Sequence, residues 1–243
     1  MAIFDDLEAE QDRLYGILSA LSDDEWAAAS LAAGWTVTDV VLHLALSEES
    51  VAAVTSGAGI GERPPPGMSV DQAMDFLVSS QRDAPAKVFQ RWQAARLAAV
   101  AALRSADPSR QYEWIGPPLK PATLATTRLA EHWAHGLDIT EPLGIDLPDT
   151  DRLSSIAWLA HRSLPYAFAL AGAEPGPVYC RLTAPDGVSA WEYGPADAAS
   201  SITGSAGAFC RVAAQRLAPE KSGLETSGPD GDLALRIVRT YAA

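Results

Sequence analysis

The segment "ATLATTRLAEHWAHGLDITEPLG", residues 122–144, decides the fold that the sequence predicts. It predicts a helix from about Ala122 to Glu141, because Pro142 cannot continue a helix and Gly144 is a common residue just past a helix end. In the same segment a carboxylate and two imidazoles fall within five positions, in a chain with only four histidines. The segment therefore bears on function as well as on fold.

Helical phase separates the polar residues of this segment. Each residue of a helix turns by about 100°, so Glu131 and His135 point within about 40° of each other. Asp138 shares that face, whereas His132 lies about 60° away from His135. A Glu/His pair four residues apart can hold a divalent metal from one helix, as in helical-bundle metal sites. The alternative is a solvated pair on the helix surface.

Other segments of the first half predict further helices with apolar faces. One begins at the N-terminus, with a face made of Ile3, Leu7, Leu14, Leu18 and Leu21. Another covers residues 34–54. A third runs from about residue 84 to 106, with inward positions at Val88, Trp92, Leu97, Val100 and Leu103. Pro- and Gly-rich stretches at 57–68 and 107–120 predict loops. With the helix at 122–141 this gives four long helices, which is typical of an all-α bundle.

Capping patterns indicate where three of the helices begin. Ser22 with Glu25 three residues later is a capping-box pattern before a short helix. Thr36 is the expected N-cap of the helix at 34–54, with Asp39 three residues on. Ser69 caps a further helix that runs towards residue 81.

His43 is the best candidate for a third metal ligand. It lies in the middle of the helix at 34–54, flanked by Val40 and Leu44 on an apolar stripe, so it faces the bundle interior. His43, Glu131 and His135 together form the most economical three-ligand site, and three protein ligands leave positions open for water or substrate. The alternative for His43 is a hydrogen-bonded core histidine. We interpret His132 and His161 as non-ligands.

The second half of the chain has a different sequence pattern, in which short strand-type segments stand beside helices. A helix is expected over 149–171, kinked at Pro165. "PVYCRLTAP" and "SAWEYGP", around the turn "APDGVS", predict a hairpin, and "SITGSAGAFCRVAAQRL" a strand, a turn and a helix. "SGLETSG" predicts a short strand and "DGDLALRIVRTYAA" a terminal helix. The predicted fold class is α+β: a bundle over residues 1–147 and a linking helix with a small α+β domain over 148–243.

Composition excludes several classes of function. The 243 residues include 18 basic and 31 acidic ones, with a formal charge of −13, so no basic face for nucleic acid is expected. Cys180 and Cys210 lie in apolar surroundings without metal or redox spacing, and we interpret them as buried. No signal peptide and no membrane span is visible, so a cytoplasmic protein without a membrane partner is expected.

Two motifs carry a resemblance to a known family. "GWTVTDVVLHL", with Trp35, Asp39 and His43, and "EHWAHGLDI" resemble the DinB-like bundle of the mycothiol-dependent maleylpyruvate isomerase family. The C-terminal segment from "SITGSAGAFCRVAAQRL" onward resembles, more loosely, the small sterol-carrier-like α+β domain that follows the bundle there. The resemblance covers nearly the whole chain in order.

The resemblance implies a bundle that binds a divalent metal, usually zinc, through His43, Glu131 and His135. Family members use the metal to activate the thiol of mycothiol, the low-molecular-weight thiol of actinobacteria, and the named ones are isomerases or thiol transferases. Asp138 would orient one of the metal ligands through a hydrogen bond, or else cap the end of the helix. The metal site alone does not specify the substrate.

An arginine of the C-terminal domain helps to hold an anionic substrate in the isomerase pattern. Arg216, which ends "CRVAAQR", is the nearest match, with Arg211 one turn earlier. An arginine near a helix end is also explained by the helix dipole alone. The aromatic-rich "WGR" form of that segment is absent, which puts maleylpyruvate itself in doubt as the substrate.

Three functions are compatible with these residues. The first is a metal-dependent enzyme that uses a low-molecular-weight thiol to isomerise a small electrophilic substrate or to transfer sulfur to it. The second is a metal-dependent hydrolase, in which the same three ligands would activate water. The third is a non-enzymatic protein that binds a metal or an apolar ligand.

Overall fold

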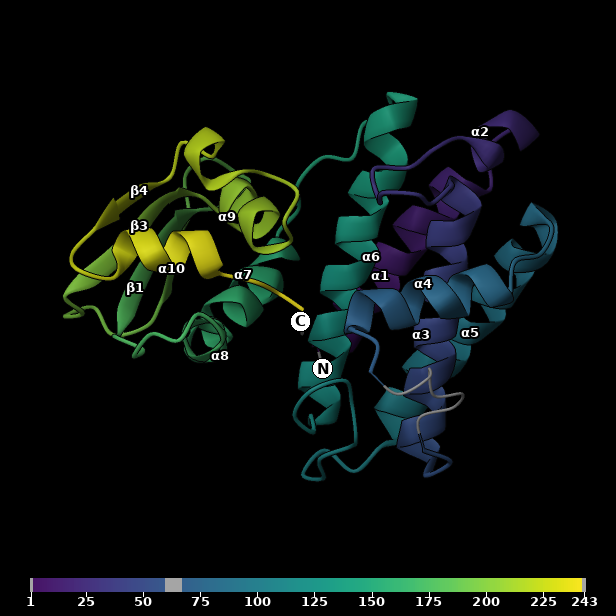
Figure 1. Ribbon diagram of the computed structural model, residues 1–243, viewed down its shortest axis with the longest axis horizontal. Helices are drawn as coiled ribbons and strands as arrows, with labels where there is room; N and C mark the ends of the chain where they lie inside the picture. The colour runs from purple at the N-terminus through teal and green to yellow at the C-terminus, as the bar shows by residue number, and fades with distance from the viewer. Residues whose placement is uncertain (1, 60–66, 242–243) are drawn as a thin grey trace. The chain divides into compact units, whose positions relative to one another are not determined.

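The computed structural model describes residues 2–59 and 67–241. The predicted loop prolines Pro64, Pro65 and Pro66 lie outside these ranges. The chain divides into two compact units, one ending at Leu147 and the other spanning Pro148–Tyr241. Ten helices and a small sheet confirm the expected α+β class among the described residues (Figure 1).

The first unit is a helical bundle. Its elements are α1 (Ala2–Leu18), α2 (Asp23–Ala27), α3 (Val37–Ser56), α4 (Val70–Ser80), α5 (Pro85–Ser105) and α6 (Pro121–Leu143). The long helices α1, α3, α5 and α6 pack side by side, and α4 runs across the bundle beside α3 (Figure 1). The predicted four long helices are therefore confirmed. None of the described helices combines the length and hydropathy needed to span a bilayer.

Local capping explains why α2, α3 and α4 begin where they do. The side chains of Ser22 and Thr36 each accept from the backbone N–H three residues on, and Glu25 and Asp39 accept in return. Ser69 makes the same exchange with Gln72 at the start of α4. Each exchange satisfies donors that the first turn of a helix leaves without intrahelical partners. The three predicted caps are confirmed.

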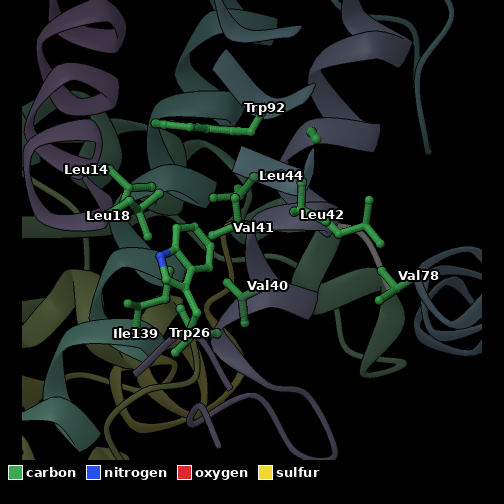
Figure 2. Close-up of a cluster of buried hydrophobic side chains, with 13 residues drawn as sticks. Leu14, Leu18, Trp26, Val40, Val41, Leu42, Leu44, Val78, Trp92 and Ile139 are labelled. Carbon is green, nitrogen blue, oxygen red and sulfur yellow. The ribbon is translucent and has the colours of Figure 1, made fainter. Parts of the chain in front are cut away.

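The apolar core of the bundle gathers around α3. Figure 2 shows Val40, Val41 and Leu44 of α3 packed with Trp26 and Trp92 in a cluster of buried side chains. The prediction that Leu97 of α5 faces inward was wrong, since it is 58% exposed. It lies five positions after Trp92, about 140° around the helix from the buried face, and Ala95 and Ala99 face inward instead.

Helix α6 runs two residues past its predicted end near Glu141 and continues through Pro142, whereas the predicted stop at Gly144 is confirmed. It continues to Leu143 and ends at Gly144, which adopts a left-handed conformation with φ of 67°. Pro142 has no N–H for the carbonyl of Asp138 four residues earlier. That carbonyl accepts instead from the backbone N–H of Leu31, at 3.0 Å, in the loop before α3. A donor from another part of the chain therefore replaces the one that proline lacks.

The second unit is a small α+β structure. It contains α7 (Leu153–Arg162), α8 (Leu164–Leu170), β1 (Val178–Thr183), β2 (Ala190–Tyr193), β3 (Ser200–Ser205), α9 (Ala206–Ala213), a 3₁₀ turn (Pro219–Lys221), β4 (Glu225–Ser227) and α10 (Gly231–Ile237). The sheet order is β2-β1-β3-β4; β1 pairs antiparallel with β2 and parallel with β3, which pairs antiparallel with β4. Helices α9 and α10 contact this sheet. The predicted hairpin, short strand and terminal helix are confirmed.

Two details of this unit differ from the sequence prediction. The single kinked helix expected over 149–171 is two helices, which meet at Ser163. Pro165, in the first turn of α8, has no N–H to donate to the carbonyl of His161 four residues earlier, so the helical ladder is interrupted there. No separate turn joins β3 to α9. Ser205 ends the strand and also caps the helix, where its side chain accepts from the N–H of Ala208.

Candidate metal centre

Two helices of the bundle bring His43, Glu131 and His135 together. The capping box places the N-terminus of α3, and His43 follows two turns later on the side that packs against α6. Glu131 and His135 are one turn apart on α6, so both project from one face. His43 is 8% exposed.

Both imidazoles face the same carboxylate oxygen. Nε2 of His43 lies 3.3 Å from Oε2 of Glu131, and Nε2 of His135 lies 3.5 Å from that oxygen. One candidate ligand atom from each residue lies within 4.8 Å of the other two. Two imidazole nitrogens and a carboxylate oxygen in this arrangement are a donor set that divalent transition metals prefer in proteins.

The pKa values at the cluster favour an ionised carboxylate. Burial alone would raise the pKa of Glu131, but hydrogen bonds with His135 and His43 hold it well below its usual range. Burial lowers the pKa of His43, and the contact with Glu131 offsets this only in part. Burial would also lower the pKa of His135, but Asp138 and Glu131 hold it above the ordinary value. A negative oxygen beside imidazoles matches what a cation requires.

The Nδ1 atoms of the two imidazoles, on the side away from Glu131, have different surroundings. Nδ1 of His135 donates to Oδ2 of the fully buried Asp138 at 2.9 Å, which turns its Nε2 towards Glu131. Nδ1 of His43 is buried and has no hydrogen-bond partner among the described residues. The ring of His43 lies instead against the indole of Trp35, with ring centroids 5.3 Å apart.

The other two histidines do not join the cluster. His132 is buried, donates from Nδ1 to the carbonyl of Arg128, and accepts at Nε2 from the indole N–H of Trp92. Burial lowers the pKa of His132 to about 3, so this ring is neutral. His161 belongs to the second unit and donates from Nε2 to the carbonyl of Val178.

A buried ion pair near the cluster was missed at the sequence level. Nε of Arg128 on α6 donates to Oε1 of Glu48 on α3 at 2.8 Å, and neither side chain is more than 4% exposed. Arg128 lies three residues before Glu131 on the helix, and that spacing was a usable signal. Nothing in the sequence shows that Glu48, in the polar run "SEES", faces inward.

Arg216 lies in the second unit. It follows Gln215, which lies just after α9 and has a left-handed φ of 62°. The Arg216 guanidinium donates to the carbonyl of Ala214 at 2.8 Å. Arg211 pairs with Asp149 at 2.8 Å. The substrate-binding role of Arg216 stays a prediction.

Comparisons with known proteins bear on the whole chain. The family model of the mycothiol maleylpyruvate isomerase N-terminal domain matches residues 7–140. Two uncharacterized proteins of Mycobacterium tuberculosis, from strains CDC 1551 / Oshkosh and ATCC 25618 / H37Rv, are each 36% identical over 246 residues, covering 98% of this chain and 94% of theirs. Crystal structures of the mycothiol-dependent maleylpyruvate isomerase and of a histidine-to-alanine mutant align with a TM-score of 0.64 over 94% of both chains, at 17% and 18% identity.

Proposed function

The chain belongs to the mycothiol maleylpyruvate isomerase family, and from that membership we propose that it is a divalent-metal-dependent enzyme of thiol chemistry. Its thiol co-substrate is mycothiol, and its second substrate is a small electrophile. The enzyme either isomerises this electrophile or attaches the thiol to it through the sulfur atom (S-transfer). The observation that carries the proposal is the convergence of two imidazole nitrogens and one carboxylate oxygen within 4.8 Å.

His43, Glu131 and His135 would hold the metal, which we take to be zinc. A divalent cation bound there lowers the pKa of a thiol that reaches it, so that thiolate is available near neutral pH. Glu131 supplies the negative charge of the ligand set. Asp138 keeps the proton of His135 on Nδ1, so the Nε2 lone pair is directed to the site.

The chain's own cysteines are poor candidates for the reacting thiol. Both Cys180 and Cys210 are buried in the second unit. Burial raises the pKa of the Cys180 thiol to about 12, and that of Cys210 is also raised. A thiol protonated and shielded in this way is a weak nucleophile. The reacting sulfur therefore comes from outside the chain, which supports a low-molecular-weight thiol as co-substrate.

The two reaction classes share their first bond. Addition of the thiol sulfur to an activated double bond, rotation about the resulting single bond and elimination of the thiol give cis–trans isomerisation with no net consumption of thiol. Displacement of a leaving group by the same sulfur gives S-transfer, which consumes the thiol. In either case Arg216 is our candidate for binding an anionic group of the electrophile.

Metal analysis tests the site. Protein purified without added metal is expected to contain about one divalent ion per chain, and the metal is lost in Glu131→Ala. A full metal complement in the triple variant His43→Ala, Glu131→Ala, His135→Ala contradicts the assignment.

Incubation with mycothiol and a panel of small electrophiles, followed by mass spectrometry, tests the chemistry. We expect thiol-dependent conversion that disappears in His43→Ala. Conversion with metal but without thiol would indicate a hydrolase. Ligand retention without turnover, surviving His43→Ala, would indicate a binding protein. Either result contradicts the proposal.

A further inference from the structure

His43 lacks the support that His135 has. A metal-binding histidine is commonly fixed by a hydrogen bond from its second nitrogen, as Asp138 fixes His135. Nδ1 of His43 is buried without such a partner in the described part of the chain. Something other than a hydrogen bond at Nδ1 must therefore fix the rotation of this ring.

The indole of Trp35 lies against both imidazoles. Its centroid is 5.3 Å from that of His43, with the planes tilted by 44°, and 6.5 Å from that of His135, with the planes at 26°. These separations are within the range over which aromatic rings attract each other. The two imidazoles are themselves 4.8 Å apart, so the three rings form one cluster. Trp35 therefore lies against both candidate ligand rings.

A single hydrogen bond fixes the indole from another helix. Nε1 of Trp35 donates to Oδ1 of Asp75 on α4 at 3.0 Å. Asp75 is exposed, whereas Ala73 and Leu77 on the opposite side of α4 are buried. The position of α4 therefore sets where the acceptor of the indole N–H lies.

The backbone of Trp35 is fixed at the same time. Its carbonyl accepts from both the N–H and the hydroxyl of Ser30, and its N–H donates to the carbonyl of Ala32. Leu31 in the same turn donates to the carbonyl that Pro142 leaves without a helical donor. The loop is thus attached to α6 at Asp138, the residue whose side chain also holds His135.

We propose that Trp35 and Asp75 form a positioning pair for the metal centre. Asp75 fixes the indole, and the indole fixes the rotation of the His43 and His135 rings so that both Nε2 atoms face Glu131. Neither residue is a ligand or a catalytic residue. The inference rests on the proposed metal site and adds to it the device that orients His43.

Titration of the full-length, metal-depleted protein with Co²⁺ tests the pair, because the visible bands of bound Co²⁺ report ligand geometry. Trp35→Leu is expected to raise the Kd for Co²⁺ roughly tenfold and to change the bands. Trp35→Phe and Asp75→Ala each remove the indole-to-carboxylate bond, and each is expected to raise the Kd about threefold to tenfold. The double variant Trp35→Phe, Asp75→Ala is expected to bind Co²⁺ no more weakly than either single variant, since both substitutions remove the same hydrogen bond. Asp75→Asn keeps an acceptor oxygen and is expected to restore the wild-type Kd.

Two controls separate positioning from general damage. Trp26→Phe alters a buried tryptophan of the same bundle whose ring packs on Phe89, and it is expected to leave the Kd unchanged. Asp71→Ala removes an exposed carboxylate one turn before Asp75 on α4 and is also expected to have no effect. Wild-type Kd and bands in Asp75→Ala or Trp35→Leu would overturn the pair, and so would equal weakening by Asp71→Ala. Failure of the wild-type protein to bind Co²⁺ would instead overturn the proposed metal site, and this inference with it.

Discussion

Asp138 uses its side chain and its main chain for different contacts. The carboxylate accepts from His135, and the carbonyl accepts from Leu31. A carboxylate behind a metal-binding histidine fixes the tautomer and increases the basicity of the ligating nitrogen. One fully buried residue therefore links a candidate ligand to the loop that contains Trp35.

Removing this carboxylate is expected to weaken the metal site. Asp138→Ala should lower metal affinity by roughly 10- to 100-fold, because Nδ1 of His135 loses its acceptor. Competition with a chromophoric chelator measures the change. Asp146→Ala, at an exposed carboxylate, serves as the control. Unchanged affinity in an Asp138→Ala protein with native circular dichroism would show that Asp138 does not act on the ligand.

At the scale of single residues, the sequence predicts the features that a single helix determines. Glu131, His135 and Asp138 could be placed on one face because helical phase is a local property. The apolar stripe around His43 predicted that it faces inward, and the structure brings it to the other two. Trp35 and Glu48 could not be placed in this way. Their partners lie 40 and 80 residues away, and only tertiary packing determines which side chains meet.

The N-terminus of α3 is secured by an ionised carboxylate. Asp39 accepts from the backbone N–H and the hydroxyl of Thr36, and from two guanidinium nitrogens of Arg82. Burial would raise the pKa of Asp39, but these hydrogen bonds outweigh it and lower the pKa. Since α3 contains His43, the start of this helix contributes to the placement of a candidate ligand.

Stability is expected to depend on the charge of Asp39. The native pKa of Asp39 is below the ordinary carboxyl value of about 3.9. The charged carboxylate therefore contributes fully to the free energy of unfolding above that value, and this contribution is lost as the pH falls through the native pKa. Asp39→Asn should lower the free energy of unfolding at pH 7 by about 1 kcal/mol and flatten its decline in acid. Urea unfolding between pH 2 and pH 7 measures both effects. An equal effect of Asp71→Asn, at an exposed carboxylate in the first turn of α4, would contradict the assignment.

The pair of Glu48 and Arg128 joins α3 to α6 within the bundle. Oε2 of Glu48 and Nη2 of Arg128 are buried without further partners in the described chain. Glu48→Ala is therefore expected to cost about 3–5 kcal/mol of stability, because it leaves a buried charge unpaired. The double variant Glu48→Leu, Arg128→Leu should lose clearly less, since no unpaired charge remains. Thermal and chemical unfolding measure the difference, and a double variant as unstable as the single one would count against this explanation.

At the scale of the helices and strands, the sequence predicts where most elements lie, and particular residues explain why some boundaries differ. Capping boxes at Ser22 and Thr36 lie within four consecutive residues, so they are visible without tertiary information. The sequence predicted a kink within one helix over 149–171, whereas the chain forms two helices, since the missing N–H of Pro165 interrupts the helical ladder in the turn before it. The end of α6 was misplaced because a distant N–H replaces the donor that proline lacks.

At the scale of the whole molecule, the candidate ligands and Arg216 belong to different units. The three candidate ligands lie before Leu147, whereas Arg216 lies in Pro148–Tyr241. We expect residues 1–147 expressed alone to fold as helices and to bind Co²⁺ within about threefold of the full-length affinity, since the core and all three side chains are internal to the unit. The shortened chain should show no turnover. Circular dichroism and Co²⁺ titration check the first part, and full activity of the shortened chain would exclude a role for Arg216.

Pro142 implies a conflict between stability and activity. A residue with an N–H at this position would complete the helix and compete with Leu31 for the carbonyl of Asp138. Pro142→Ala is therefore expected to raise the melting temperature, while the amide of Leu31 exchanges its hydrogen faster and metal affinity falls. Hydrogen–deuterium exchange with mass spectrometry compares the two proteins, and unchanged exchange at residue 31 would refute the expectation. Selection for stability alone would remove this proline, whereas selection for an ordered metal site would keep it.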